Sequence, residues 1–213
     1  MQTRLHWNYF LALERDLQAV SRYIEFCQPN MQVFSIELAH LLFAAASEVD
    51  TVAKCVCQLL DPKAECENIN HYRSIIQKAE DEQEYASTPG AVMLDIHKHK
   101  ISTLQVIIPH CSIEFIPWES WAKDTNPDWW HSYNKVKHQR NDHFNEATLH
   151  NSIYALGALL VMNYVFCRME ITKDNPKLRY HYTGISVTRH LTPDPVFIRL
   201  KEHFYENIRH DLE

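Results

Sequence analysis

The chain has 213 residues, of which 46% are hydrophobic and 23% are charged, and this length suits one domain with a sizeable core. Only three residues are glycine, so tight hairpin turns are scarce and a mainly helical fold is expected. The formal net charge of −6 argues against attraction of the whole molecule to nucleic acid, which leaves only a local basic strip for such a role.

The N-terminal composition and the spacing of the cysteines bear on the cellular compartment. Charged side chains interrupt the first thirty residues, so this stretch lacks the apolar run of a secretory signal. The six cysteines lack the Cys-x-x-Cys spacing of a zinc site. His97 and His99 offer two imidazoles close together, but no third or fourth ligand can be named. We therefore expect a cytoplasmic protein with reduced thiols, no metal and no cofactor.

Three helices are predicted in the first part of the chain. Apolar residues recur at three- and four-residue spacing over about 4–28, which predicts an amphipathic helix ended by Pro29. A second, more apolar helix is predicted over about 33–60, and its four charged side chains argue against a membrane span. A third is predicted over about 67–86, with a run of acidic residues at its end that suits a solvated surface.

The second part of the chain mixes extended segments with helices. Short β-branched and aromatic runs cut by prolines predict an extended or β insertion over about 91–117. Helices are predicted over about 128–145 and 147–169, and the latter is apolar nearly all round, so it should cross the core. Extended segments are expected over about 180–200. The whole is predicted to be a single, mainly α domain over residues 1–213.

A basic and aromatic-rich segment from Trp129 to His143 is the one stretch that points to a chemical function. If the segment is helical, Asn134 and His138 lie one turn apart, with Cβ atoms about 5–6 Å from each other. Three cations accompany them, which makes the segment basic within an acidic protein. These cations are Lys135, Lys137 and Arg140.

This set of side chains suits the cleavage of RNA without a metal ion. Such a reaction needs a base for the 2′-hydroxyl proton, an acid for the leaving oxygen and cations for the phosphate. His138 suits the proton transfers because the unperturbed pKa of an imidazole, about 6.5, lies near neutral pH. The three cations suit the phosphate, and Trp130 and Tyr133 could stack on an unpaired base. The alternative is structural, since an Asn–His pair one turn apart is often an internal hydrogen bond.

The same segment resembles the HEPN superfamily in its prokaryotic, uncharacterised or defence-associated branches. The residues that carry the resemblance are Trp129-Trp130, then Tyr133-Asn134-Lys135-Val136-Lys137-His138, then Phe144, ahead of an apolar helix. Members of that superfamily are helical bundles, usually dimeric, and many are metal-independent endoribonucleases of toxin–antitoxin, abortive-infection or CRISPR systems. Their signature is an Arg, four to six residues and then a His, commonly with an Asn directly after the Arg.

The resemblance assigns roles residue by residue. Asn134 and His138 match the Asn and His of the signature, while Tyr133 occupies the position of the Arg. The match implies a HEPN-like helical bundle in which His138 is a general base or acid and Asn134 orients it or the phosphate. The cations Lys135, Lys137 and Arg140 would hold the RNA backbone, and Trp130 and Tyr133 would line the groove.

Two functions are compatible with this resemblance. The first is a metal-independent endoribonuclease in a defence or toxin–antitoxin setting, a homodimer with RNA as substrate and an antitoxin or defence-system protein as partner. The second is a catalytically inactive HEPN-like module that dimerises or binds a partner protein or a nucleotide. The loss of the signature Arg favours the second unless Lys137 or Arg140 takes over its contact with the phosphate. No membrane association is expected in either case.

Overall fold

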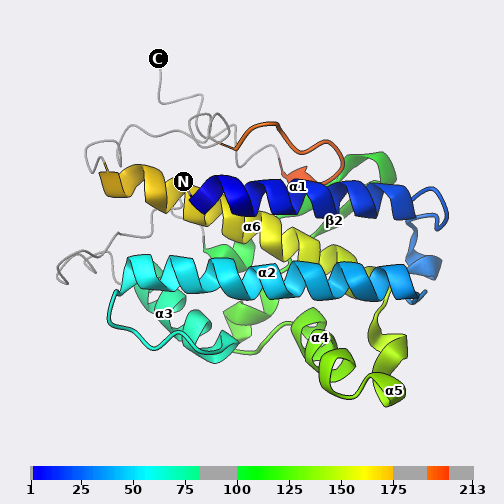
Figure 1. Cartoon of the computed structure of the whole chain (residues 1–213), viewed down its shortest axis with the longest axis horizontal. Helices are drawn as coiled ribbons and strands as arrows, with labels where there is room; N and C mark the ends of the chain where they lie inside the picture. Colours follow the sequence, from blue (N-terminus) through cyan, green and yellow to red (C-terminus); the bar gives the residue numbers. More distant parts are fainter. Residues whose placement is uncertain (1, 82–99, 175–190, 202–213) are drawn as a thin grey trace.

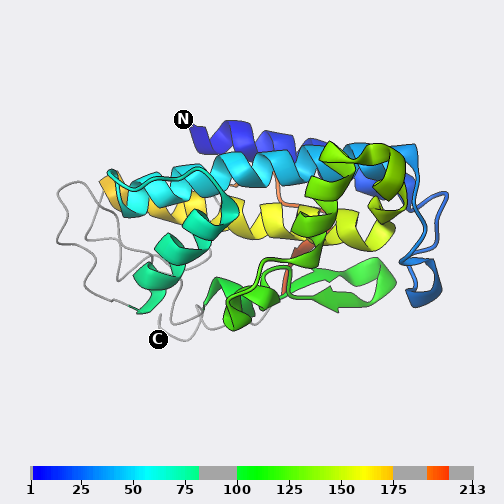
Figure 2. The same ribbon diagram turned by 90° about the horizontal axis from the view of Figure 1, so that it is seen from below.

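The computed structural model describes residues 2–81, 100–174 and 191–201, and its architecture is a helical bundle that covers a small sheet. Three long helices run side by side along the molecule: α1 (Gln2–Val20), α2 (Ile36–Leu60) and α6 (Leu149–Asp174). In Figure 1, α2 and α6 run in one direction and α1 runs in the other. Seen from below, α6 lies between the α1–α2 layer and the sheet (Figure 2). The predicted mainly α fold with a small β insertion is confirmed.

The position of α6 follows from its composition, because apolar side chains occur on all of its faces. From Leu149 to Met169, only Tyr154 and His150 are partly exposed, and the other side chains are buried. The segment Leu149–Ile171 is long and apolar enough to cross a membrane by length and composition, and 94% of its apolar stretch is buried inside the fold. This burial is consistent with a core helix.

Hydrogen bonds fix the start of α2 and its contact with α6. The Ser35 hydroxyl oxygen accepts a hydrogen bond from the Leu38 amide at 3.1 Å, which caps the N-terminus of α2. On α6, the buried Ser152 hydroxyl donates to the Leu38 carbonyl oxygen at 2.9 Å. The same hydroxyl lies 2.9 Å from the Thr148 carbonyl oxygen of its own segment, so it is shared between α6 and α2 at their buried contact.

A three-stranded antiparallel sheet packs on the other side of α6, with the strand order β2–β1–β3. Its strands are β1 (Val106–Ile108), β2 (Ile113–Phe115) and β3 (Arg199–Leu200). Phe115 packs so closely on α6 that a Cβ atom at Gly157 would lie 2.6 Å from its ring. Glycine at this position therefore lets the sheet approach the helix.

The shorter helix α3 (Ile69–Asp81) packs on α2, α4 (Asp128–His138) packs on both α2 and α6, and α5 (Arg140–His143) packs on α4. Single 3-10 turns connect the elements at Gln28–Asn30, Ile101–Thr103, Pro109–Cys111, Glu119–Lys123 and Phe144–Glu146.

The observed bounds differ from the sequence-based predictions in two helices. The helix predicted over 4–28 ends at Val20, where the Ser21 hydroxyl donates to the Gln18 carbonyl oxygen at 2.7 Å. The helix predicted over 128–145 is broken at Gln139, whose backbone leaves the helical conformation and separates α4 from α5. Apolar periodicity gives no signal for either break.

The other predicted elements agree more closely or fall partly outside the described residues. The helices predicted over 33–60 and 147–169 correspond to α2 and α6, and the one over 67–86 corresponds to α3 up to Asp81. Residues 82–99 and 175–190 are outside the described part, so the start of each predicted extended segment, with His97 and His99, is not described.

Glu14 on α1 holds the C-terminal segment against the bundle. Its side chain is buried, at 4% exposure, and one carboxylate oxygen accepts hydrogen bonds from the amides of Phe197 (2.7 Å) and Ile198 (3.0 Å). These bonds precede β3 directly and place it beside β1.

We expect Glu14→Ala to lower the free energy of unfolding by about 2–4 kcal/mol, because it leaves two buried amides without an acceptor. Urea denaturation would measure the change. The control is Asp16→Ala, which removes an exposed carboxylate two residues away and should cost no more than about 0.5 kcal/mol. Equal effects of the two changes would show that the Glu14 contacts contribute little.

Candidate functional site

Helix α4 carries the candidate site, and buried aromatic rings hold it in place. The Trp129 indole nitrogen donates to the Pro117 carbonyl oxygen at 2.9 Å, and the Trp118 indole nitrogen donates to the Ala158 carbonyl oxygen of α6 at 3.4 Å. The two indole rings meet edge to face, with their centroids 5.3 Å apart. One face of α4 is thereby fixed to α6, and the opposite face carries the polar residues of the basic segment.

Trp130 and Tyr133 do not line an open groove. Their side chains are 8% and 6% exposed, and their ring centroids lie 5.4 Å apart. The Tyr133 ring also meets Phe43 of α2 edge to face, at 5.9 Å. The expectation that these two rings stack on an unpaired base is therefore wrong for this conformation, because both are used to join α4 to the bundle.

The Asn134 side chain is hydrogen-bonded to the backbone of its own helix. Its amide nitrogen donates to the Trp130 carbonyl oxygen at 3.0 Å, and its side chain is half-buried. Within the described residues, no hydrogen bond joins Asn134 to His138. The predicted alignment of the pair on one helix is present, but Asn134 does not orient the imidazole in this structure.

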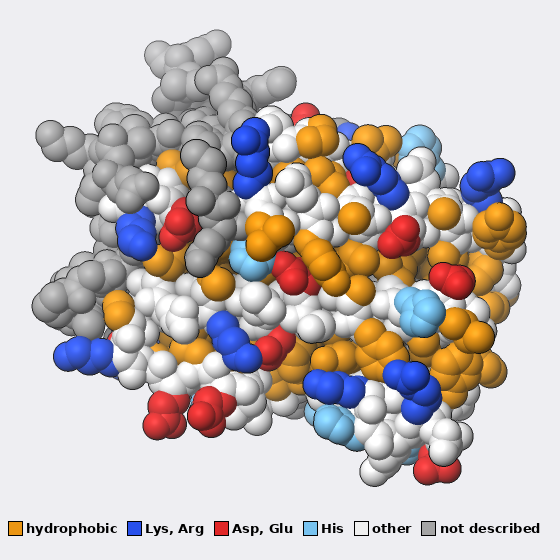
Figure 3. Space-filling view, in the orientation of Figure 1, with side chains coloured by type: hydrophobic (Ala, Val, Ile, Leu, Met, Phe, Trp, Pro, Cys, Tyr) orange, Lys and Arg blue, Asp and Glu red, His pale blue; other side chains and the backbone are white. Residues whose placement is uncertain are grey.

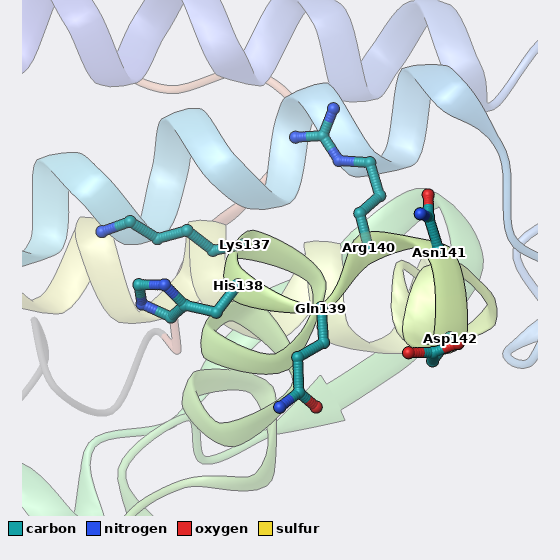
Figure 4. A pocket seen from close by; sticks show the side chains of 6 residues that line it. All are labelled: Lys137, His138, Gln139, Arg140, Asn141 and Asp142. Carbon is teal, nitrogen blue, oxygen red and sulfur yellow. The ribbon is translucent and has the colours of Figure 1, made fainter.

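His138 lies at an open depression of about 500 Å³ where α4 turns into α5. Its side chain is exposed. The residues that line the depression are Lys137, His138, Gln139, Arg140, Asn141 and Asp142. Lys137 and His138 point to the same side, whereas Arg140 points toward α2 (Figure 4). Of the sequence-predicted residues, His138, Lys137 and Arg140 line the depression, with Arg140 directed away from the other two, and Asn134 and Lys135 are not among the lining residues.

The two cations at the depression each lie over an aromatic ring. The Lys137 ammonium is 5.3 Å from the Tyr133 ring centroid, and the Arg140 guanidinium is 5.0 Å from the Phe43 ring centroid. Neither forms an ion pair with a carboxylate within the described part of the chain. Lys, Arg and His side chains gather over α4 and α5 at the lower right of the molecule, beside hydrophobic surface (Figure 3). Both charges thus remain open to a negatively charged ligand.

Lys135 differs from the other two cations because Glu146 neutralises it. The Lys135 ammonium lies 2.9 and 3.3 Å from the two carboxylate oxygens of Glu146. The same carboxylate accepts a hydrogen bond from the Ser132 hydroxyl at 3.0 Å and lies 2.9 Å from Nδ1 of His143. Glu146 therefore joins α4, α5 and the 3-10 turn that precedes α6.

Sequence reasoning missed Glu146 and Phe43. Glu146 lies eleven residues after Lys135, across the break at Gln139, so no helical spacing connects them. Phe43 belongs to α2 and meets Arg140 only through tertiary packing. No pattern in the sequence signals either contact.

The described residues include no group of three or more His, Cys, Asp or Glu side chains that could hold a metal ion. The six cysteines, Cys27, Cys55, Cys57, Cys66, Cys111 and Cys167, are all free. Comparison with protein-family models, curated proteins and solved structures gave no match. The side chains that meet at the α4–α5 junction are thus the main guide to function.

The pKa of Glu146 gives a prediction for acid stability. Burial raises this pKa, but hydrogen bonds from Lys135, Ser132 and His143 outweigh the burial and lower it below its usual value. A carboxyl with a lowered pKa stabilises the fold above its unfolded pKa, about 4.3, and this stabilisation is lost as the pH falls through the folded pKa.

We therefore expect Glu146→Gln to lose less stability than the wild type when the pH falls from about 6 to about 3. Urea midpoints measured across this range would test it. Glu119→Gln, which changes an exposed carboxyl without these hydrogen bonds, should behave like the wild type. A Glu146→Gln curve parallel to that of the wild type would contradict the role given to the carboxylate.

Proposed function

We propose that this protein is a metal-independent endoribonuclease whose active site is the depression at the α4–α5 junction. The observation that carries the proposal is that exposed His138 and the cations Lys137 and Arg140 line one open depression. His138 exchanges a proton with the 2′-hydroxyl or the leaving oxygen, and the two cations hold the phosphate. The resemblance to HEPN nucleases in the Asn134 to His138 segment supports the same assignment.

The accessibility of His138 supports a chemical role over a structural one. A structural histidine is normally buried and bonded to the backbone, whereas the His138 side chain is exposed at the end of α4. The guanidinium expected by the HEPN signature is absent at Tyr133, and Arg140 lies two residues after His138. Arg140 is planar and can form two hydrogen bonds to one phosphate, so it takes over that contact.

A second copy of the chain completes the proposed site. Cleavage needs both a base and an acid, and His138 is the only imidazole among the residues that line the depression. The proposed two-fold homodimer has this depression at its interface, so that the axis brings a second His138 and a second pair of cations to it. The proposed setting is a cytoplasmic defence or toxin–antitoxin system with an antitoxin or defence-system protein as partner.

Incubation of the purified protein with mixed cellular RNA in EDTA tests this function. We expect cleavage by the wild type, and a rate lower by about 100-fold or more for His138→Ala, because general acid–base catalysis contributes that much. The matched control is His131→Ala, an exposed histidine of the same helix outside the depression, which should cleave normally. Loss of cleavage in both variants, or in neither, would contradict the assignment to His138.

A second candidate function is a catalytically inactive HEPN-like module that dimerises or binds a partner protein or a nucleotide. Two observations favour it: Asn134 donates a hydrogen bond to the Trp130 carbonyl oxygen, and Tyr133 is buried. The residues at these two positions of the HEPN signature are therefore not available to a substrate. Absence of cleavage by the folded wild type would establish this alternative over the nuclease.

The three cations should contribute unequally to RNA binding. Lys137→Gln and Arg140→Gln should each reduce the slope of log affinity against log salt concentration by about 1, because each cation contacts one phosphate. Lys135→Gln should change the slope less, since Glu146 already neutralises this ammonium. Fluorescence anisotropy with labelled RNA at several salt concentrations measures the slopes. Equal changes for all three variants would show that the Glu146 ion pair opens on binding.

A further inference from the structure

A second cationic depression lies away from the α4–α5 junction, at the end of α1. It has a volume of about 560 Å³, within the range of small-ligand sites, and is open to solvent. Its lining residues are Arg15, Gln18, Ala19, Ser21, Arg22, His110 and Phe197. Two guanidinium groups and one imidazole thus surround a concave surface in a protein whose formal charge is −6.

Both arginines line the depression, although only one of them is helical. Arg15 lies in α1, whereas Arg22 lies in the turn that follows Val20. The small, exposed Ala19 also lines the depression, so the two arginines border one open surface. His110 reaches the depression from the 3-10 turn between β1 and β2.

The wall of the depression opposite α1 consists of His110 and Phe197, and two contacts hold it in place. The His110 and Phe197 rings are stacked, with centroids 6.4 Å apart and planes at 24°. The Phe197 amide donates to the buried carboxylate of Glu14. Of the two carboxylates that flank Arg15 in the sequence, Glu14 is therefore directed into the fold and does not neutralise the arginines. The depression is held by α1, the sheet and the C-terminal segment together.

The arginines are not neutralised by other described side chains. Neither Arg15 nor Arg22 forms an ion pair or hydrogen bond through its guanidinium with residues 2–81, 100–174 or 191–201. Asp16 lines a different groove, between α1 and α2. Glu25 is near enough to Cys111 to add to the effect of burial in raising the pKa of that thiol, but it does not line the depression.

We infer that this depression binds the phosphate group of a phosphate monoester. A monoester carries nearly two negative charges at neutral pH, which matches two guanidinium groups, and Arg binds phosphate oxygens with two parallel hydrogen bonds. The exposed His110 ring, which stacks on the buried Phe197 ring, lies beside that phosphate and suits a planar group on the ester. The site is separate from the proposed nuclease centre and does not depend on it.

Titration of the protein with AMP, followed by amide NMR, tests the inference. We expect saturable shifts at Ser21, Arg22 and His110, and an affinity at least about tenfold lower for Arg15→Gln/Arg22→Gln, because charged hydrogen bonds are lost. Arg22→Lys keeps the charge and should still weaken binding, since the two-bond geometry is lost.

Two controls locate the site and identify the ligand class. Arg4→Gln, which removes an exposed arginine near the other end of α1, should show the same AMP-dependent shifts at Ser21, Arg22 and His110 as the wild type. Absence of shifts at these residues at millimolar AMP, or unchanged binding by the Arg15/Arg22 double variant, would overturn the inference. Tighter binding here of a short RNA without a terminal phosphate would also overturn it, in favour of phosphodiester recognition.

Discussion

The burial of α6 is the constraint on which the rest of the fold depends. A helix that is apolar on all faces can be stable in water only if other elements cover every face. Helices α1 and α2 cover one side, the sheet covers another, and α4 covers the flank (Figure 2). The sheet reaches α6 because residue 157 is glycine, and α2 is fixed to it through Ser152. The sheet, α2 and α4 thus each have a specific contact with α6 as well as apolar surface.

The candidate site depends on the aromatic side chains through which α4 packs on α6 and α2. Trp129 and Trp118 fix α4 to α6, and Tyr133 meets Phe43 of α2. These rings occupy one face of α4, so the other face and the break at Gln139 remain open to solvent. The Tyr133 and Phe43 rings also lie beneath Lys137 and Arg140. The aromatic rings that hold α4 in place therefore also lie beneath these two cations.

The partners of the carboxylates determine where positive charge remains on the surface of this acidic protein. Glu146 neutralises Lys135, and Glu14 is turned inward to backbone amides, so neither opposes the open cations near it. Two of the places where described cations have no carboxylate partner are the pair at the α4–α5 junction and the pair of arginines at the end of α1. A net negative charge thus coexists with two local surfaces suited to phosphate groups.

The sequence alone determined the fold class, the long helices and the clustering of basic residues near His138, because these depend on local composition and apolar periodicity. It predicted α2 and α6 well, since long apolar runs leave few alternatives. It could not place the break at Gln139, the burial of Trp130 and Tyr133, or the capture of Lys135 by Glu146. Those features arise from contacts between residues far apart in the chain or across an irregular turn, where helical spacing does not predict which residues meet. Only tertiary packing decided which residues of the basic segment are exposed to solvent and which hold the helix in place.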